Sequence, residues 1–366
     1  MQQPVTGEHL KTMSVYGPIY WTVIALATFA ILFSGCNIVK KNTRTPTLLK
    51  TEDASQAELM NEVNRFARVN SMRAKMDLKF EDNSFAQFGS KEVYRAADGE
   101  VVVQRPAMIL LKVQVPVIKT DVAQMTSDGK KFRVAILNDG GSGKYKKFVK
   151  GTNDADYTKL QKSLDRSDDG GDIKRNVNAF ANLRPQHFTD ALLVRPIDPA
   201  NIYTVSTIFQ IENDESQNKK SPLYTVMRGY YLLDEFARQD DGSLKIVRRF
   251  WFDRVGGYRL ARQQLFDARS EIDSDIVYGR EGALTATGEY ANLPLRIQVT
   301  RPKEKYTMSL TYQTPDAVTI GKNYPATAFI LQNTWGLDEL DLDQKLAEMN
   351  AGKPATNSAV VAKPER

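Results

Sequence analysis

Apolar and polar residues alternate along much of the chain, and this feature restricts its fold more than any other. Residues 74–80 carry apolar side chains at every second position with charged ones between them, and residues 306–312 repeat the pattern with polar partners. Because successive side chains of a β-strand point to opposite faces, this period of two predicts strands with one buried and one wetted face. Such strands are typical of antiparallel sheets, so we expect a mainly antiparallel fold.

Turn residues separate the predicted strands at short intervals. Glycine accepts the positive φ angles of tight turns, and Asp-Gly pairs are a common hairpin signal. We therefore expect turns at residues 97–99, 127–129, 240–242 and 256–257. The predicted strands comprise residues 74–80, 109–115, 132–136, 202–211, 223–236, 244–253, 258–267, 295–299 and 306–312, and residues 94–105 are predicted to form a hairpin about residues 97–99.

Three segments carry helical signals instead. Ser55 and Glu58 form a capping-box pattern, and apolar residues follow at three- and four-residue spacing to about Asn70, which predicts an amphipathic helix. An insertion at residues 138–200 contains two short helical stretches, the second of which restarts at Pro185. Four of their apolar residues are candidates for a lid over the sheet: Phe180, Leu183, Phe188 and Leu192. Residues 337–366 are expected to form a helix, around 337–349, and then a disordered tail.

Cys36 is the only cysteine, and it follows an apolar run and the small residues Ser34 and Gly35. This pattern is typical of a bacterial lipoprotein signal, in which the cysteine is acylated once the preceding segment is cleaved. Phe33 stands where such signals usually have leucine. We expect residues 1–35 to be a signal peptide and residues 36–54 a lipidated N-terminus with a flexible tether. The folded domain would then comprise residues 55–336.

Two other interpretations of this segment remain open. Residues 14–39 contain no charged side chain and are long enough to span a bilayer as an uncleaved anchor, although Gly17-Pro18 interrupts the run. Lys40 and Lys41 would then place the following domain in the cytoplasm. The third interpretation is a buried core helix.

Composition excludes several chemistries. One cysteine allows no internal disulfide, and the two histidines, His9 and His187, offer little for imidazole metal sites or histidine triads. The 50 basic and 44 acidic residues are mixed along the chain, so the net charge of +6 forms no basic stripe for nucleic acid. Residues 140–144 lack the full phosphate-loop pattern. We expect a protein that is not an enzyme and holds no metal, in which His187 is a solvated helix residue.

The order of elements resembles the LolA/LolB-type family of lipoprotein carriers and receptors. The motifs that carry the resemblance are Gly99 before a strand that leads into Gln104-Arg105-Pro106, a strand ending in Val115-Pro116, and residues 127–130, 251–254, 278, 294–297 and 328–331. The resemblance implies an α+β fold, mainly antiparallel β, with an open curved half-barrel sheet, an N-terminal amphipathic helix and short covering helices. The insertion at 138–200 departs from the compact length of such carriers.

An open sheet must cover its apolar face with helices, another chain or a ligand, and a purely apolar slot can hold an acyl chain. The candidate cavity residues are Met76, Leu78, Phe80, Ile109, Leu111, Val113, Phe132, Val134, Ile136, Phe250, Phe252, Leu295 and Ile297. Each of them taken alone is also an ordinary core residue. Arg105 is a candidate to bond lid or loop carbonyls, because its guanidinium offers five donors.

The sequence thus predicts a monomeric lipoprotein of the outer membrane, facing the periplasm, whose only attached group is the covalent lipid on Cys36. Asn37 after the cysteine permits outer-membrane sorting, by the same resemblance. Its partners would be membrane lipid, an acylated lipoprotein or other lipid cargo, and a soluble periplasmic carrier. The alternative function is an envelope sensor or scaffold that binds a protein partner with the same fold.

Overall fold

The computed structural model describes residues 45–82, 92–114, 120–138, 146–157, 160, 185–279, 293–313 and 318–351. Residues 46–366 form one compact unit, separate from residues 1–45. The predictions for the signal peptide, Cys36, Phe180, Leu183 and the loop at 140–144 lie outside the described residues. Within the described ranges, none of the helices combines the length and apolar character that crossing a membrane requires.

The helices are α2 (Gln56–Ala67), α5 (Gln186–Leu192), the 3-10 helix η3 (Ala326–Phe329) and α6 (Leu342–Asn350). The strands of the first half are β1 (Thr47–Leu48), β2 (Ser71–Asp82), β3 (Glu92–Gln104), β4 (Met108–Gln114), β5 (Asp121–Ser127), β6 (Lys131–Ile136), β7 (Phe148–Thr152) and β8 (Ile202–Asn213). Those of the second half are β9 (Thr225–Arg238), β10 (Leu244–Asp253), β11 (Arg259–Phe266), β12 (Ile272–Tyr278), β13 (Arg296–Arg301), β14 (Tyr306–Tyr312), β15 (Thr319–Ile320) and β16 (Glu339–Asp341).

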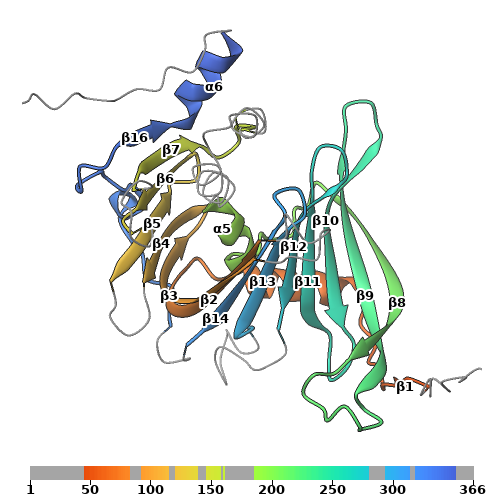
Figure 1. The fold of residues 1–366 in the computed structure, drawn as a ribbon. Helices are drawn as coiled ribbons and strands as arrows, with labels where there is room; N and C mark the ends of the chain where they lie inside the picture. The colour runs from red at the N-terminus through yellow and green to blue at the C-terminus, as the bar shows by residue number, and fades with distance from the viewer. Residues whose placement is uncertain are drawn as a thin grey trace, which may run out of the picture. The chain divides into compact units, whose positions relative to one another are not determined.

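The described strands form one open sheet in the order β1-β9-β10-β11-β12-β13-β14-β2-β3-β4-β5-β6-β7-β16 (Figure 1), with β8 on β9 and β15 on β2. Neighbours pair antiparallel except β1 with β9 and β16 with β7. Helix α5 contacts both β13 and β4, which are four steps apart in the order, because the sheet curves around it. The predicted fold class, a mainly antiparallel open curved sheet with an N-terminal helix and short covering helices, is confirmed.

Helix α2 begins as its capping box predicts. The Glu58 N–H donates to Ser55 Oγ at 3.3 Å, and the Ser55 N–H donates to Glu58 Oε2 at 2.7 Å. These bonds satisfy two donors that a helix start leaves free. Leu59, Val63 and Phe66 form its buried stripe and pack into the main apolar cluster.

We call the face of the sheet that packs against α2 and α5 the interior face. Alternate residues of β2 show it well: Ala74, Met76 and Leu78 are buried in the same cluster as the two helices. The opposite, outer face carries a smaller cluster of Tyr230, Leu232, Trp251 and Ala261, with Ile208 packed against it. Residues at alternate positions of the strands therefore lie on two different faces of the sheet, and each face carries an apolar cluster.

The hairpin predicted at residues 97–99 is wrong. Strand β3 runs straight through these residues, and Gly99 lies opposite Met76 of β2. A Cβ on Gly99 would lie 2.6 Å from Leu78 Cδ1, so the glycine makes room for the leucine of the neighbouring strand. An Asp-Gly pair here serves close packing, not a turn. The other three predicted turns are present, with positive φ at Gly129, Gly242, Gly256 and Gly257.

Two segments predicted to lie outside the sheet belong to it. Residues 47–53, predicted as part of the tether, are bound: β1 pairs with β9, and Glu52 N donates to Arg254 O at 2.8 Å. Strand β7, inside the predicted insertion, pairs with β6 and with β16. Both strands are too short for their alternation to stand out in the sequence. The C-terminal helix is present as α6, but it begins at Leu342 and not near residue 337, because residues 339–341 form β16. Its N-cap Asp341 accepts from Gln344 N at 3.1 Å.

Candidate functional site

The structure gathers the candidate cavity residues on the interior face. Ten of the thirteen are members of the main buried cluster, and Phe80, Val113 and Leu295 are partly buried and pack against it. They come from β2, β4, β6, β10 and β13 and the residue before β13, so strands far apart in the sequence supply one largely apolar surface. Within the described residues this surface is packed in one cluster with side chains of α2 and α5.

Residues 185–201, which we call the cover segment, lie over this surface as α5 and the loop after it. Pro185 starts the helix, as predicted, and no side chain caps it. Phe188, Ala191, Leu192, Leu193 and Val194 are buried in the main cluster. Of the four lid candidates, Phe188 and Leu192 therefore lie against the interior face. A seven-residue helix is too short to be stable alone, so its position depends on contacts with the sheet.

Side chains of the sheet hold the cover segment by its backbone carbonyls. Arg105 donates to Val194 O at 2.7 Å and also to Val69 O at 3.0 Å. Tyr278 Oη donates to Ala191 O at 3.3 Å. Arg248 donates from its two terminal nitrogens to Arg195 O and Pro196 O, each at 2.8 Å. The cover is thus attached by a few polar bonds at its C-terminal part as well as by apolar packing.

His187 is buried, which corrects the prediction that it is solvated. Its exposed fraction is 8%, and its Nδ1 lies 2.7 Å from Tyr306 Oη. The two rings stack with centroids 6.3 Å apart. The prediction failed because helix α5 lies on the sheet with this residue turned toward β14, which the short helical pattern does not reveal.

A buried ion pair joins the cover segment to β9 and β10. Glu235 and Arg248 are 1% and 4% exposed, and the Arg248 guanidinium donates to the Glu235 carboxylate. The same carboxylate accepts from Asn201 Nδ2 at 2.7 Å and from Tyr203 Oη at 2.9 Å. Three donors around one buried carboxylate satisfy its lone pairs, as a charge in the interior requires.

Burial, followed by the hydrogen bond to Glu235, raises the pKa of Tyr203 to about 12. A phenol whose folded-state pKa is raised contributes stability that is fully present below about pH 10 and is lost as the pH rises through 12. We expect the difference in unfolding free energy between the wild type and Tyr203→Phe to shrink between pH 10 and 12. Urea unfolding at pH 8 and across that interval measures it, and a constant difference would contradict the expectation.

Two polar side chains interrupt the interior face on β11 and β12. Gln263 and Ser274 are each 1% exposed, and Gln263 Oε1 and Ser274 Oγ have no hydrogen-bond partner among the described residues. The register places Gln263 opposite Phe250 and Ser274 opposite Leu265, both interior residues. Buried oxygens without partners cost about 1–3 kcal/mol each. The interior face therefore has unused polar capacity beside its apolar surface.

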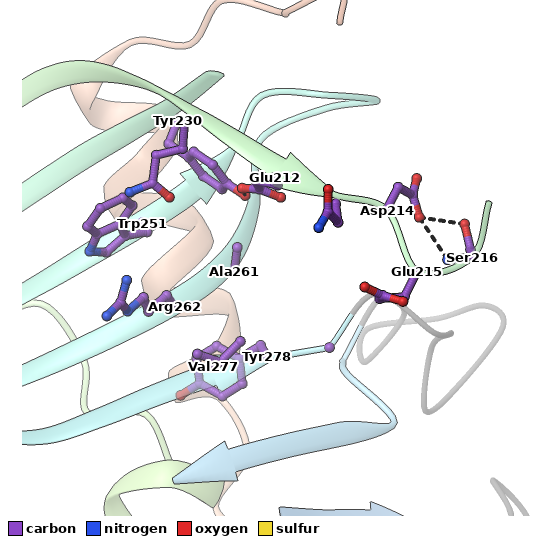
Figure 2. A pocket seen from close by; sticks show the side chains of 13 residues that line it. Glu212, Asp214, Glu215, Ser216, Tyr230, Trp251, Ala261, Arg262, Val277 and Tyr278 are labelled. Carbon is purple, nitrogen blue, oxygen red and sulfur yellow. Dashed lines mark hydrogen bonds between the residues drawn. The ribbon is translucent and has the colours of Figure 1, made fainter. Parts of the chain in front are cut away.

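A hollow of about 660 Å³ lies on the outer face (Figure 2). Tyr230 and Trp251 meet edge to face at its floor, with centroids 5.8 Å apart, and the Arg262 guanidinium lies 5.0 Å from the Trp251 ring. Its rim carries Glu212, Asp214 and Glu215.

Several polar groups of this hollow are bonded within the protein. Tyr230 Oη donates to Glu212, and Arg262 pairs with Asp275. Asp214 Oδ1 accepts from Ser216 Oγ at 2.6 Å. Among the described residues, no group of His, Cys, Asp and Glu is placed to hold a metal ion.

No family model and no curated protein matches the chain. Among solved structures, the chain is similar to a LolA superfamily protein from Nitrosomonas europaea, at 9% identity and a TM-score of 0.38, over 76% of this chain and 99% of that one. It is similar to a DUF1329 family protein from Desulfovibrio piger, at 10% identity and 0.37, over 75% and 95%. A domain described as outer membrane lipoprotein-sorting, from Vibrio parahaemolyticus, matches at 8% identity and 0.35, over 74% and 94%.

TM-scores below 0.5 carry no conclusion about function, which has to come from the geometry of the chain itself.

Proposed function

We propose that this chain binds acyl chains on the interior face of its sheet, beneath the cover segment, and takes part in lipoprotein or lipid transfer at the outer membrane, where a lipid on Cys36 anchors it. The observation that carries the proposal is a largely apolar surface whose cover is a short helix without a side-chain cap, held by hydrogen bonds to backbone carbonyls of the segment. Burying ~14 methylenes of one acyl chain would supply roughly 11 kcal/mol before ordering costs.

Opening the cover is the step that such binding requires. The apolar side chains of α5 would leave the interior face and an acyl chain would replace them, so one apolar contact is exchanged for another. The lost hydrogen bonds involve carbonyl oxygens that water can then satisfy. Gln263 and Ser274 would offer partners to the ester or amide groups that accompany an acyl chain.

Loosening the cover tests the proposal. Arg105→Met and Tyr278→Phe each remove a donor to a cover carbonyl, so we expect a fluorescent fatty acid to associate several-fold faster because the open state is more populated. Arg249→Met is the matched control, since Arg249 pairs with Asp234 on the outer face. Stopped-flow fluorescence measures the rates, and thermal melting shows that each variant is folded. Absence of binding by any form, or equal rates for all of them, would count against the proposal.

The second candidate is a scaffold or sensor that binds a protein partner. It is favoured by the packing of all thirteen interior residues in or against one cluster, which leaves the chain's own side chains in contact where a ligand would lie. Native mass spectrometry of protein purified without detergent distinguishes the two: bound lipid supports acyl binding, whereas a lipid-free protein that captures a defined partner supports the scaffold.

A further inference from the structure

Strand β8 forms an edge of the sheet, at the far end of the strand order from β7 (Figure 1). Its 12 residues pair with β9 without a register shift, from Ile202 opposite Phe236 to Asn213 opposite Thr225. In the described part of the chain, no strand pairs with the other side of β8. A long, straight edge presents a row of unpaired backbone groups and is a template for another strand.

The hydrogen bonds around β9 show which of these groups are free. Asp214 N donates to Tyr224 O at 2.7 Å, and these two residues lie opposite each other one step beyond the end of the β8–β9 pairing. The even-numbered residues of β8 are therefore the ones that form hydrogen-bonded pairs with β9. On the other side of β9, Gly229 O accepts from Arg254 N at 3.1 Å, so odd-numbered residues of β9 face β10. Because bonded residues alternate along an antiparallel strand, the odd-numbered residues of β8 direct their N–H and C=O groups outward. Within residues 202–211 they are Tyr203, Val205, Thr207, Phe209 and Ile211, and we call this row the β8 edge.

The β8 edge lacks the features by which proteins prevent strand addition. Residues 202–211 include no charged residue and no proline, although charged residues make up 26% of the chain. Val205, Phe209 and Ile211 are 36%, 48% and 63% exposed, and all three lie on the same face of the strand. Lysine, proline or a bulge would normally protect such an edge. Exposed apolar side chains next to free backbone groups instead favour an apolar strand as partner.

We propose that the β8 edge pairs with the β8 edge of a second copy of this chain, antiparallel about a two-fold axis at Thr207. In this register Thr207 lies opposite Thr207 of the second copy, and Val205 lies opposite Phe209. Tyr203 then lies opposite Ile211. These are Thr–Thr and aromatic–β-branched pairs, which are favourable across strands. Glu212, the one charged residue of β8, lies opposite Ile202, so the pairing brings no like charges together.

The strength of this pairing is of the right order for a specific dimer. The five residues of the β8 edge form five bonded pairs with two bonds each, or about ten main-chain hydrogen bonds, the number found in a typical interface. A two-fold axis normal to the sheet places the interior faces of both copies on the same side. The proposal replaces the monomer that the sequence predicts, and it is independent of acyl binding.

A disulfide at the axis tests both the dimer and its register. In the full chain carrying Cys36→Ser, we expect Thr207→Cys to form a disulfide-linked dimer on oxidation, because bonded residues in such a pair have Cα atoms about 5.5 Å apart, within disulfide range. Ser206→Cys is the control: its side chain points to the outer face and lies opposite Ile208, so we expect it to stay monomeric under the same conditions. Equal crosslinking of the two variants, or none for Thr207→Cys, would refute the register.

Sedimentation without any crosslink provides the second readout. Thr207→Lys places two like charges opposite each other at the axis, and we expect at least a tenfold weaker dimer. Thr207 is exposed, so the melting temperature should not change. Thr204→Lys, on the outer face opposite Gln210, should retain the dimer. A wild-type chain that sediments as a monomer at every concentration, or a dimer that survives Thr207→Lys, would overturn the proposal.

Discussion

Replacing Arg248 with alanine is expected to lower the free energy of unfolding by about 3–5 kcal/mol, as removal of one partner of a buried ion pair does. The variant leaves the Glu235 carboxylate, 1% exposed, without its counter-charge. It also removes the donors to Arg195 O and Pro196 O, so the cover segment loses two of its ties. Urea unfolding followed by circular dichroism measures the loss.

Arg249, the next residue along β10, provides a matched control. It pairs with Asp234 on the outer face, where the two side chains are 32% and 13% exposed. Such partly solvated pairs contribute about 0–1 kcal/mol, so Arg249→Ala should be only slightly destabilised. Combining Arg248→Met with Glu235→Leu should restore part of the loss, because no charge then stays buried alone. Similar losses for Arg248→Ala and Arg249→Ala would show that burial of the pair does not matter.

Replacing Phe132 with alanine at the other end of the sheet is expected to cost about 3–5 kcal/mol. Phe132 is fully buried, and its ring meets Tyr157 edge to face with centroids 6.4 Å apart. It also packs on Gly151, where a Cβ would lie 2.9 Å from Phe132 Cζ. This close packing leaves little freedom for the site to collapse into the cavity. Phe132→Leu, which keeps most of the volume, should cost under about 1.5 kcal/mol.

Phe132→Ala and Arg248→Ala together test whether the sheet unfolds as one unit. Phe132 lies on β6 and Arg248 on β10, and eight strands separate these two in the sheet order. If the sheet is one cooperative unit, both variants lower the denaturation midpoint with an unchanged m-value, and their effects add within about 0.5 kcal/mol. A second transition in either variant would divide the sheet into independently stable halves.

Local signals predicted much of this fold. The start of α2 follows from Ser55 and Glu58 alone, since a capping box is complete within one helical turn. Strand β10 occupies the residues predicted for it, 244–253, which follow the turn signal at residues 240–242. In contrast, Asp98-Gly99 carries the same signal as Asp128-Gly129 yet forms no turn. The difference arises from Leu78 on the adjacent strand, and no local pattern contains that contact.

The polar parts of the site were harder to predict. Glu235 shares its strand face with Leu233 and Tyr231, and Arg248 shares its face with Phe250. A charged residue on the apolar face of each of two neighbouring strands indicates a buried ion pair. The pair can be recognised only when the register of the two strands is known. The ties from Arg248 to residues 195 and 196 depend on where a loop closes over the sheet. Contacts of that kind follow from tertiary packing.

The backbone pairing between β1 and β9 limits the distance between Cys36 and the folded domain. Backbone pairing holds the chain from Thr47 onward, and Cys36 stands eleven residues earlier. A fully extended chain of that length reaches at most ~40 Å. With Cys36 acylated as proposed, the segment between Cys36 and Thr47 keeps the folded domain next to the bilayer that holds the lipid. The domain would act as a stationary receiver to which cargo is delivered, and a separate shuttle would have to cross the space between two membranes.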